Sequence, residues 1–141
     1  MKILFVCTGN TCRSPMAQVM AAQLFGDSYE VASTGVMAMP KQKASTHAIE
    51  AMKQRKIDLT KHKSQMMSED LLKWADLILT MTESHKYAIA DEKAHTLGEY
   101  AGINASISDP FGGDLDTYLS CAKEIYELLE KINNSLKGEK K

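Results

Sequence analysis

The stretch that decides the fold lies at the N-terminus and reads Ile3-Leu4-Phe5-Val6-Cys7-Thr8-Gly9-Asn10-Thr11-Cys12-Arg13-Ser14-Pro15. Its first four residues are apolar β-formers, which predict a buried strand. Ser14 is a good helix cap and Pro15 suits a first helical position, so we expect a helix to begin there. The residues between them then form a short loop from strand to helix.

This loop has the components of a phosphate site with a nucleophile inside it. A loop before a helix directs backbone amides, and the positive end of the helix dipole, at one spot. Gly9 and Asn10 tolerate the positive φ that a tight ring of amides requires. Arg13 adds a planar fork for two phosphoryl oxygens. We expect Cys7, beside these charges, to be a nucleophilic thiolate, although the simplest explanation of a cysteine there is a structural, buried one.

Length and composition bound the possible functions. The 141 residues suffice for one domain, residues 1–141, and 44% hydrophobic with 25% charged residues is typical of a soluble globular protein. A net charge of −1 argues against nucleic acid or a membrane surface as a partner. No apolar run approaches the roughly 20 residues of a membrane span. Three cysteines without a secretory signal favour the cytoplasm.

Short apolar runs alternate with amphipathic segments, which predicts a single α/β domain: a four-stranded parallel sheet with helices on both faces. We expect strands at residues 3–6, 29–33, 76–81 and 94–97. We expect helices from Ser14 to Gly26, from a Thr46 cap to about Arg55, from a Ser68 cap to Trp74, after a Thr82 cap, and at the C-terminal end. Residues 102–113 read as loop, and residues 137–141 as a polar tail that frays. Cys121 and most of the nine methionines fall at helical core spacing.

A thiolate that attacks phosphorus needs a partner to protonate the leaving group. The candidate is Asp109, in Ser-Asp-Pro-Phe-Gly-Gly before the last helix. Pro110 keeps Asp109 out of a helix, and Phe111 supplies an apolar wall. Taken alone, this motif is also a common turn.

The octet from Cys7 to Ser14 resembles the phosphate loop of the low-molecular-weight protein tyrosine phosphatases, Cys-x-Gly-Asn-x-Cys-Arg-Ser. The late Asp-Pro-aromatic motif also resembles theirs, so the resemblance covers essentially the whole chain. It implies a two-step reaction through a phosphocysteine on Cys7, with Arg13 and the amides of residues 8 to 13 holding the phosphoryl oxygens. Asp109 would act as general acid and then as general base. No metal or organic cofactor is implied, and no metal-ligand spacing appears.

The same resemblance implies roles for further loop residues. Ser14 would donate to the thiolate and Asn10 would brace the loop, with His62 as its holder or, equally, as a plain surface histidine. Cys12 is either a small filler or the partner of a reversible disulfide with Cys7 that protects the nucleophile from over-oxidation. Thr8, Gly9, Thr11 and Phe111 complete the predicted substrate-binding set.

Two departures from the tyrosine phosphatase pattern bear on the substrate. Thr11 stands where those enzymes usually have Ile, and Gly112 where they commonly have a second aromatic residue. A hydroxyl could orient a guanidinium group, and the missing aromatic removes one wall of a phenyl slot. The combination resembles the bacterial protein-arginine phosphatase branch and favours phosphoarginine on proteins as substrate. The alternative is that Thr11 is a tolerated variant in a tyrosine phosphatase.

Three other classes of protein fit the sequence less well. An arsenate reductase of this fold needs further redox cysteines in mid-chain, and residues 13 to 120 contain none. A phosphocarrier domain of a sugar transport system would not need Arg13 or Asp109. A silent phosphoprotein-binding module would not need the nucleophile, the arginine and the acid together. The sequence therefore favours a phosphatase that acts on phosphorylated proteins, with a monomer expected.

Overall fold

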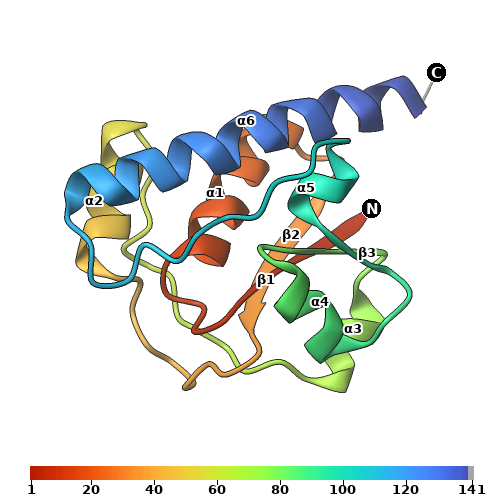
Figure 1. Ribbon diagram of the computed structural model, residues 1–141, viewed down its shortest axis with the longest axis horizontal. Helices are drawn as coiled ribbons and strands as arrows, with labels where there is room; N and C mark the ends of the chain where they lie inside the picture. The colour runs from red at the N-terminus through yellow and green to blue at the C-terminus, as the bar shows by residue number, and fades with distance from the viewer. Residues whose placement is uncertain (140–141) are drawn as a thin grey trace.

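Strands and helices alternate along residues 1–139, the part of the chain that the computed structural model describes (Figure 1). In chain order they are β1 (Lys2–Cys7), α1 (Arg13–Phe25), β2 (Glu30–Gly35), α2 (Thr46–Gln54), α3 (Glu69–Trp74), β3 (Leu77–Thr80), α4 (Glu83–Ile89), β4 (Ala94–Thr96), α5 (Leu97–Tyr100) and α6 (Leu115–Glu139). All four predicted strands are present, with ends that differ by at most two residues.

The strands form one parallel sheet in the order β2-β1-β3-β4. In the register, Val6 of β1 pairs with Thr34 on one side and Thr80 on the other. β2, the next strand in the chain, lies on one side of β1, and β3 lies on the other side. The carboxyl end of β1 is therefore a topological switch point. Ligands of open α/β sheets bind at such a point.

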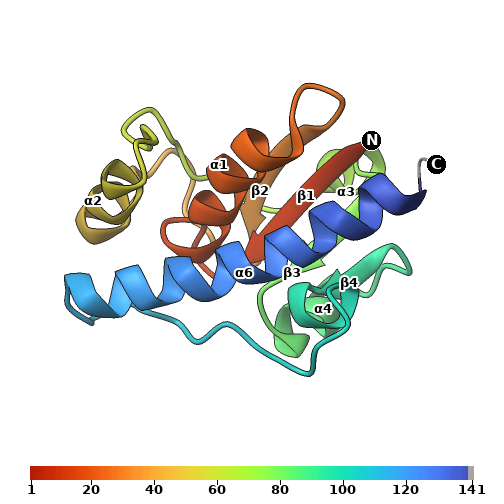
Figure 2. The same ribbon diagram turned by 90° about the horizontal axis from the view of Figure 1, so that it is seen from above.

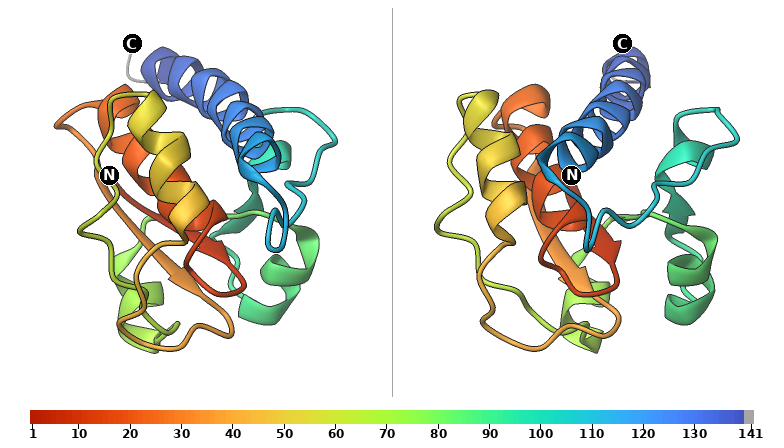
Figure 3. Two further views of the ribbon diagram at one scale, coloured as in Figure 1. Left: turned by 90° about the vertical axis from the view of Figure 1, so that its left-hand side faces the viewer. Right: turned by 60° about the vertical axis from the view of Figure 1, so that its left-hand side comes forward.

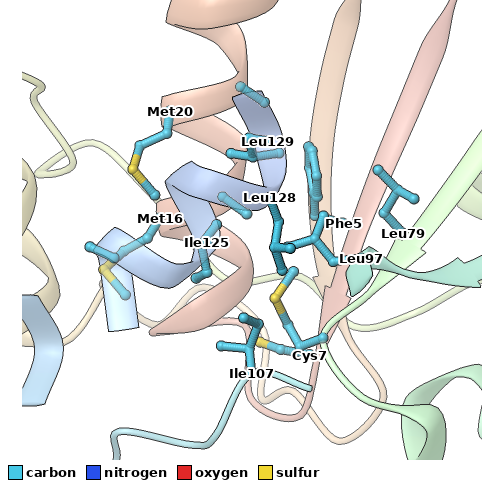
Figure 4. Close-up of a cluster of buried hydrophobic side chains, with 14 of the residues drawn as sticks. Phe5, Cys7, Met16, Met20, Leu79, Leu97, Ile107, Ile125, Leu128 and Leu129 are labelled. Atoms are coloured by element: carbon cyan, nitrogen blue, oxygen red, sulfur yellow. The ribbon is translucent and has the colours of Figure 1, made fainter. Parts of the chain in front are cut away.

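Helices cover both faces of the sheet, as predicted. On one face α1 and α6 pack over Ile3, Phe5 and Leu79, with α2 against α6 at the edge of this layer, and on the other face α3 and α4 pack over Leu4, Val6 and Ile78 (Figures 1 and 2). Residues on alternate sides of β1 thus bury into separate clusters. The larger core includes Met16 and Met20, as their helical spacing predicts, and Figure 4 shows both in the cluster that also holds Ile125 of α6. The expectation that most of the methionines fill the core was wrong, because Met1, Met37, Met39 and Met66 lie outside the helices and are exposed.

Two predicted helix caps are one or two residues out of place. Ser14 does not cap α1: the helix begins at Arg13, and Cys12 at the cap position makes no side-chain capping bond. The Ser14 hydroxyl instead contacts Cys7 and Asn10. Thr46 is the first residue of α2, and the preceding Ser45 caps it by accepting from the Ala48 amide.

Two other expectations need correction. The short α5 follows β4 directly, where no helix was predicted, although Thr96 and Glu99 form a capping box that marks its start. The final helix continues through residues 137–139, which were expected to fray, and residues 140 and 141 lie outside the described residues. Within residues 1–139 no helix combines the length and apolar character needed to cross a membrane.

Candidate active site

The loop between β1 and α1 meets the loop before α6 at the carboxyl edge of the sheet, and both views of Figure 3 show the two loops side by side. They enclose a pocket of about 280 Å³ that is lined by Cys7, Thr8, Gly9, Thr11, Cys12, Arg13, Asp109 and Phe111. The nucleophile, the arginine and the acid predicted from opposite ends of the chain therefore line one small pocket.

The loop from Thr8 to Cys12 turns its carbonyl groups outward. The carbonyl of Thr8 accepts from the Met37 amide, that of Asn10 from His62, and that of Thr11 from the Ser45 amide. Within residues 1–139, no backbone amide of this loop donates to a protein acceptor. Amides that are free of internal partners beside a helix N-terminus are donors for an anion.

Asn10 alone carries the positive φ that the loop needs. Its φ is 57°, whereas Gly9, expected to share this role, has no positive φ. A Cβ at Gly9 would meet only the Thr11 hydroxyl, at 3.7 Å. The tight turn therefore depends on Asn10, a residue type that adopts this conformation more readily than most.

Hydrogen bonds satisfy the whole Asn10 side chain, which is fully buried. Its Nδ2 donates to Ser14 Oγ (2.8 Å) and Ser33 Oγ (2.9 Å), and its Oδ1 accepts from the Gln65 amide (2.9 Å). His62 Nε2 lies 2.7 Å from the Asn10 carbonyl oxygen, so His62 meets the backbone of Asn10 rather than its side chain. Burial lowers the pKa of His62, against the opposing effect of this hydrogen bond.

Gly35, at the end of β2, supports the loop from behind. A Cβ there would lie 2.4 Å from the Thr8 carbonyl oxygen and 2.9 Å from the Asn10 nitrogen. Only glycine allows the loop backbone to approach so closely. Nothing in the local sequence around Gly35 predicts this contact.

Ser14 Oγ lies 2.9 Å from Cys7 Sγ and 3.3 Å from the Thr34 carbonyl oxygen. A hydroxyl has one proton, and Asn10 already donates to this oxygen. A thiolate accepts only, so a charged Cys7 would draw the Ser14 proton from Thr34 to sulfur. The geometry thus allows the donation to Cys7 that the family pattern implies.

Arg13 is buried and is held from two sides. Its Nη1 donates to the Ile107 carbonyl (2.8 Å) and its Nη2 to Thr8 Oγ1 (3.3 Å). Ile107 is placed by a hydrogen bond from its own amide to the Met81 carbonyl, just beyond β3. The guanidinium is therefore oriented by backbone and side chains before any substrate binds.

Asp109 faces Arg13 but is held loosely. Its Oδ2 lies 3.7 Å from Arg13 Nη2, and its side chain is 53% exposed. Its Oδ1 accepts from the Phe111 amide (3.1 Å). Phe111, expected to wall the acid in, is 81% exposed and lies at the rim of the pocket.

Thr11 and Cys12 both line the pocket, and Thr11 Oγ1 lies 3.7 Å from Cys12 Sγ. The Cys12 thiol also makes hydrogen bonds with Ser45 Oγ (3.5 Å) and Tyr118 Oη (3.4 Å). Burial, and then the contact with Cys12, raises the pKa of Tyr118 to about 12. Both Cys7 and Cys12 are free thiols. Cys121 lies in the core as predicted, and burial raises the pKa of its thiol to about 12.

One buried residue beside the pocket was not predicted from the sequence. His85 of α4 is buried, and its Nε2 lies 2.9 Å from Thr8 Oγ1. A signal for it existed: the helix after β3 starts at the same sheet edge as the phosphate loop, because β1 and β3 are parallel neighbours. Within residues 1–139, no group of three or more His, Cys, Asp or Glu side chains is arranged to hold a metal ion.

Comparison with known proteins agrees with this geometry. The family model described as low molecular weight phosphotyrosine protein phosphatase matches residues 2–141. The protein-arginine-phosphatase of Bacillus subtilis is 42% identical, with all of both chains covered. The low molecular weight protein-tyrosine-phosphatase PtpB of Staphylococcus epidermidis is 41% identical, covering 94% of this chain and 96% of the relative.

A solved structure extends the likeness to the fold and the loop. The YwlE arginine phosphatase, in a mutant with a phosphorylated active-site serine, superposes with a TM-score of 0.92 at 43% identity, covering 97% of this chain and 96% of the other. The predicted four-stranded phosphatase fold is confirmed. From its full-length family match and its relatives, the chain belongs to the low molecular weight phosphotyrosine protein phosphatase family.

Proposed function

We propose that this protein hydrolyses phosphoarginine on proteins through a phosphocysteine intermediate. The observation that carries the proposal is the pocket itself, in which Cys7, Arg13 and Asp109 meet beside the Thr11 hydroxyl. The names of the Bacillus subtilis and Geobacillus stearothermophilus relatives, both protein-arginine-phosphatases, support it.

In the first step the Cys7 thiolate attacks phosphorus, and an S–P bond forms as the P–N bond to the arginine breaks. Arg13 and the unpartnered amides of the loop bind the three phosphoryl oxygens, whose charge changes most in the transition state. Asp109 gives its proton to the departing nitrogen of the phosphoguanidinium, so the arginine side chain leaves as a guanidinium cation.

In the second step a water molecule attacks the phosphocysteine. Asp109, now a carboxylate, takes a proton from this water, the S–P bond breaks, and inorganic phosphate leaves. Ser14 Oγ, 2.9 Å from Cys7 Sγ, donates a hydrogen bond to the sulfur as the thiolate forms again. The proton taken from water leaves Asp109 protonated again, ready for the next cycle.

The substrate preference rests on Thr11 and Gly112. A polar hydroxyl in the pocket suits a guanidinium better than a phenyl ring, and Gly112 adds no aromatic wall after Phe111. The alternative, a tyrosine phosphatase, is favoured by the name of the Staphylococcus epidermidis relative, a protein-tyrosine-phosphatase. The choice between the two depends on one side chain and is therefore open to a direct test.

Phosphoarginine and phosphotyrosine peptides of the same sequence provide that test. We expect wild-type kcat/KM to be higher on phosphoarginine, Thr11→Ile to shift the ratio toward phosphotyrosine, and Cys7→Ser to abolish both activities. A wild-type preference for phosphotyrosine, unchanged by Thr11→Ile, would favour the tyrosine phosphatase. Turnover of p-nitrophenyl phosphate that survives Cys7→Ser would exclude the phosphocysteine route for either substrate.

We also infer that Cys12 is the redox partner of Cys7. An oxidant such as hydrogen peroxide would convert Cys7 to a sulfenic acid, and Cys12 would displace water from it to form a disulfide. Cys12 lies in the same pocket as Cys7, which supports the proposal. Thiol-reactive mass labelling after peroxide treatment, with and without dithiothreitol, tests it.

We place the protein in the cytoplasm as a monomer without nucleic-acid or membrane partners. Three buried free thiols suit a reducing compartment, and the net charge of −1 provides no basic field for an anionic polymer. Its partners are then the phosphorylated proteins themselves. Light scattering of the purified chain tests the monomer.

A further inference from the structure

The two-step reaction leaves one buried titratable group beside the pocket unused. His85 is 5% exposed and lies between two hydroxyls: its Nε2 is 2.9 Å from Thr8 Oγ1, and its Nδ1 is 3.1 Å from Thr82 Oγ1. Thr8 in turn is 3.3 Å from Arg13 Nη2. A continuous chain of hydrogen bonds therefore joins α4 to the phosphate-binding arginine.

The chemistry of these groups assigns a direction to every bond. A guanidinium only donates, so Thr8 Oγ1 accepts from Arg13. The Thr8 hydroxyl then has one proton left, which it donates to His85 Nε2. In the neutral ring the proton must be on Nδ1, which donates to Thr82 Oγ1. Thr82 Oγ1 also accepts the His85 amide as the cap of α4, so it fixes the imidazole at both ends.

Burial and the nearby charge of Arg13 keep the His85 ring in this neutral form. Burial and then the positive charge of Arg13 lower the pKa of His85 to about 4, while Asp109 acts in the opposite direction. A neutral acceptor leaves Arg13 as the positive group next to Thr8. A lysine or a charged histidine in its place would repel the guanidinium and could not accept from Thr8.

We propose that His85 is a positioning residue that acts through Thr8 to hold the Arg13 guanidinium where the phosphoryl group binds. Its counterpart on the other side is the Ile107 carbonyl, which accepts from Nη1 at 2.8 Å. One terminal nitrogen is thus tied toward α4 and the other toward the segment that carries Asp109. This inference rests on the proposed phosphatase function, since it concerns the same arginine.

Two conservative variants separate positioning from mere packing. In His85→Asn the amide reaches the Nδ1 position and keeps the Thr82 contact, but nothing accepts from Thr8. In His85→Gln the amide oxygen reaches the Nε2 position and can accept from Thr8. We expect His85→Asn to lower kcat/KM on p-nitrophenyl phosphate roughly tenfold, the size of one lost hydrogen bond in a chain to a charged group, and His85→Gln to recover most of it.

A double-mutant cycle shows whether the effect passes through Thr8. Thr8→Val removes the hydroxyl at nearly constant shape, and in this background we expect His85→Asn to cause less than a twofold further loss. The affinity for orthovanadate, which imitates the five-coordinate transition state, should fall more than the affinity for inorganic phosphate. His95→Asn, on β4 against Tyr100, is the matched control and should leave both affinities unchanged.

The outcomes distinguish this inference from the proposed function. Unchanged turnover and unchanged orthovanadate affinity in His85→Asn would overturn the positioning role, as would full additivity with Thr8→Val. Active wild-type enzyme in those experiments would leave the phosphatase proposal standing. Conversely, a wild-type chain without turnover, whose orthovanadate affinity still drops in His85→Asn, would support the positioning role and refute the phosphatase.

Discussion

The two loops that form the pocket differ in how firmly they are held. In the phosphate loop, Asn10 and Ser14 are fully buried and their side chains are hydrogen-bonded throughout. In the loop before α6 (residues 101–114, the acid loop), the Asp109 side chain is half exposed and Phe111 is 81% exposed. One loop is built like the core of the protein, and the other like its surface.

This difference matches what the proposed reaction requires of each loop. The phosphate loop has to present donors at fixed positions to a changing charge, which requires an environment that does not reorganise. The acid loop must reach the leaving group and also exchange protons with water. At 3.7 Å from Arg13, Asp109 has yet to form a close contact, and apo geometry of this kind often tightens in the substrate complex. We therefore expect changes in the acid loop to affect the reaction, and changes in the phosphate loop to affect reaction and stability together.

Within the acid loop, the largest expected effect comes from Asp109→Asn. An amide cannot supply the proton, so we expect kcat to fall by about 10²–10⁴. The unfolding free energy should change by less than about 1 kcal/mol, because a half-exposed ion pair contributes little. Asp116→Asn, an exposed carboxylate in the first turn of α6, is the control. A large loss of stability with Asp109→Asn would contradict the contrast between the loops.

Asn10→Ala should break the phosphate loop itself. Three side-chain hydrogen bonds are lost, Ser33 and the Gln65 amide are left without this partner, and alanine must adopt a φ of 57°. We expect the unfolding free energy measured by chemical denaturation to fall by about 2–4 kcal/mol, and turnover to be lost as well. Asn104→Ala, an exposed asparagine in the loop before Asp109, should change neither. Full activity in Asn10→Ala would show that the loop does not depend on its brace.

Which residues of the site could be predicted depends on sequence separation, not on which loop they belong to. Cys7, Arg13 and Asp109 stand in short local motifs, and the strand before and helix after the first motif follow from residue type. The strand and the helix were predicted nearly in full. The positive φ was assigned to Gly9 as well as Asn10, because composition shows which residues tolerate a conformation but not which one adopts it.

The residues that were missed act across long sequence separations. Gly35 meets the loop from β2, and His85 meets Thr8 from 77 residues away. Neither has a local pattern that marks it, since each contact depends on the strand order β2-β1-β3-β4. Ser14 was misplaced as a cap for a related reason: its hydroxyl is used by Cys7 and Asn10 rather than by the helix.

A pH titration of stability probes His85, which contacts the phosphate loop through Thr8. The pKa of His85 is about 4 in the folded chain and 6.5 ordinarily, so between these values the unfolded chain binds more protons. Stability is then complete above pH 6.5 and falls as the pH drops toward 4, by up to about 3 kcal/mol. His62, whose pKa is also lowered, acts in the same direction. His85→Asn should flatten this part of the denaturation profile, and an unchanged slope would argue against a neutral buried ring.

Phe111→Ala should give the smallest effect and the sharpest contrast with Asn10→Ala. At 81% exposed, the ring contributes little to the core, so stability should change by less than about 0.5 kcal/mol. It nevertheless lines the rim of the pocket, and its removal should raise KM for a phosphorylated protein a few-fold while leaving kcat nearly unchanged. Tyr87→Ala removes another exposed ring, on α4, and should leave KM unchanged. If Phe111→Ala lowered kcat as much as Asp109→Asn, the ring would be positioning the acid rather than the substrate, and the acid loop would be more ordered during turnover than its exposure suggests.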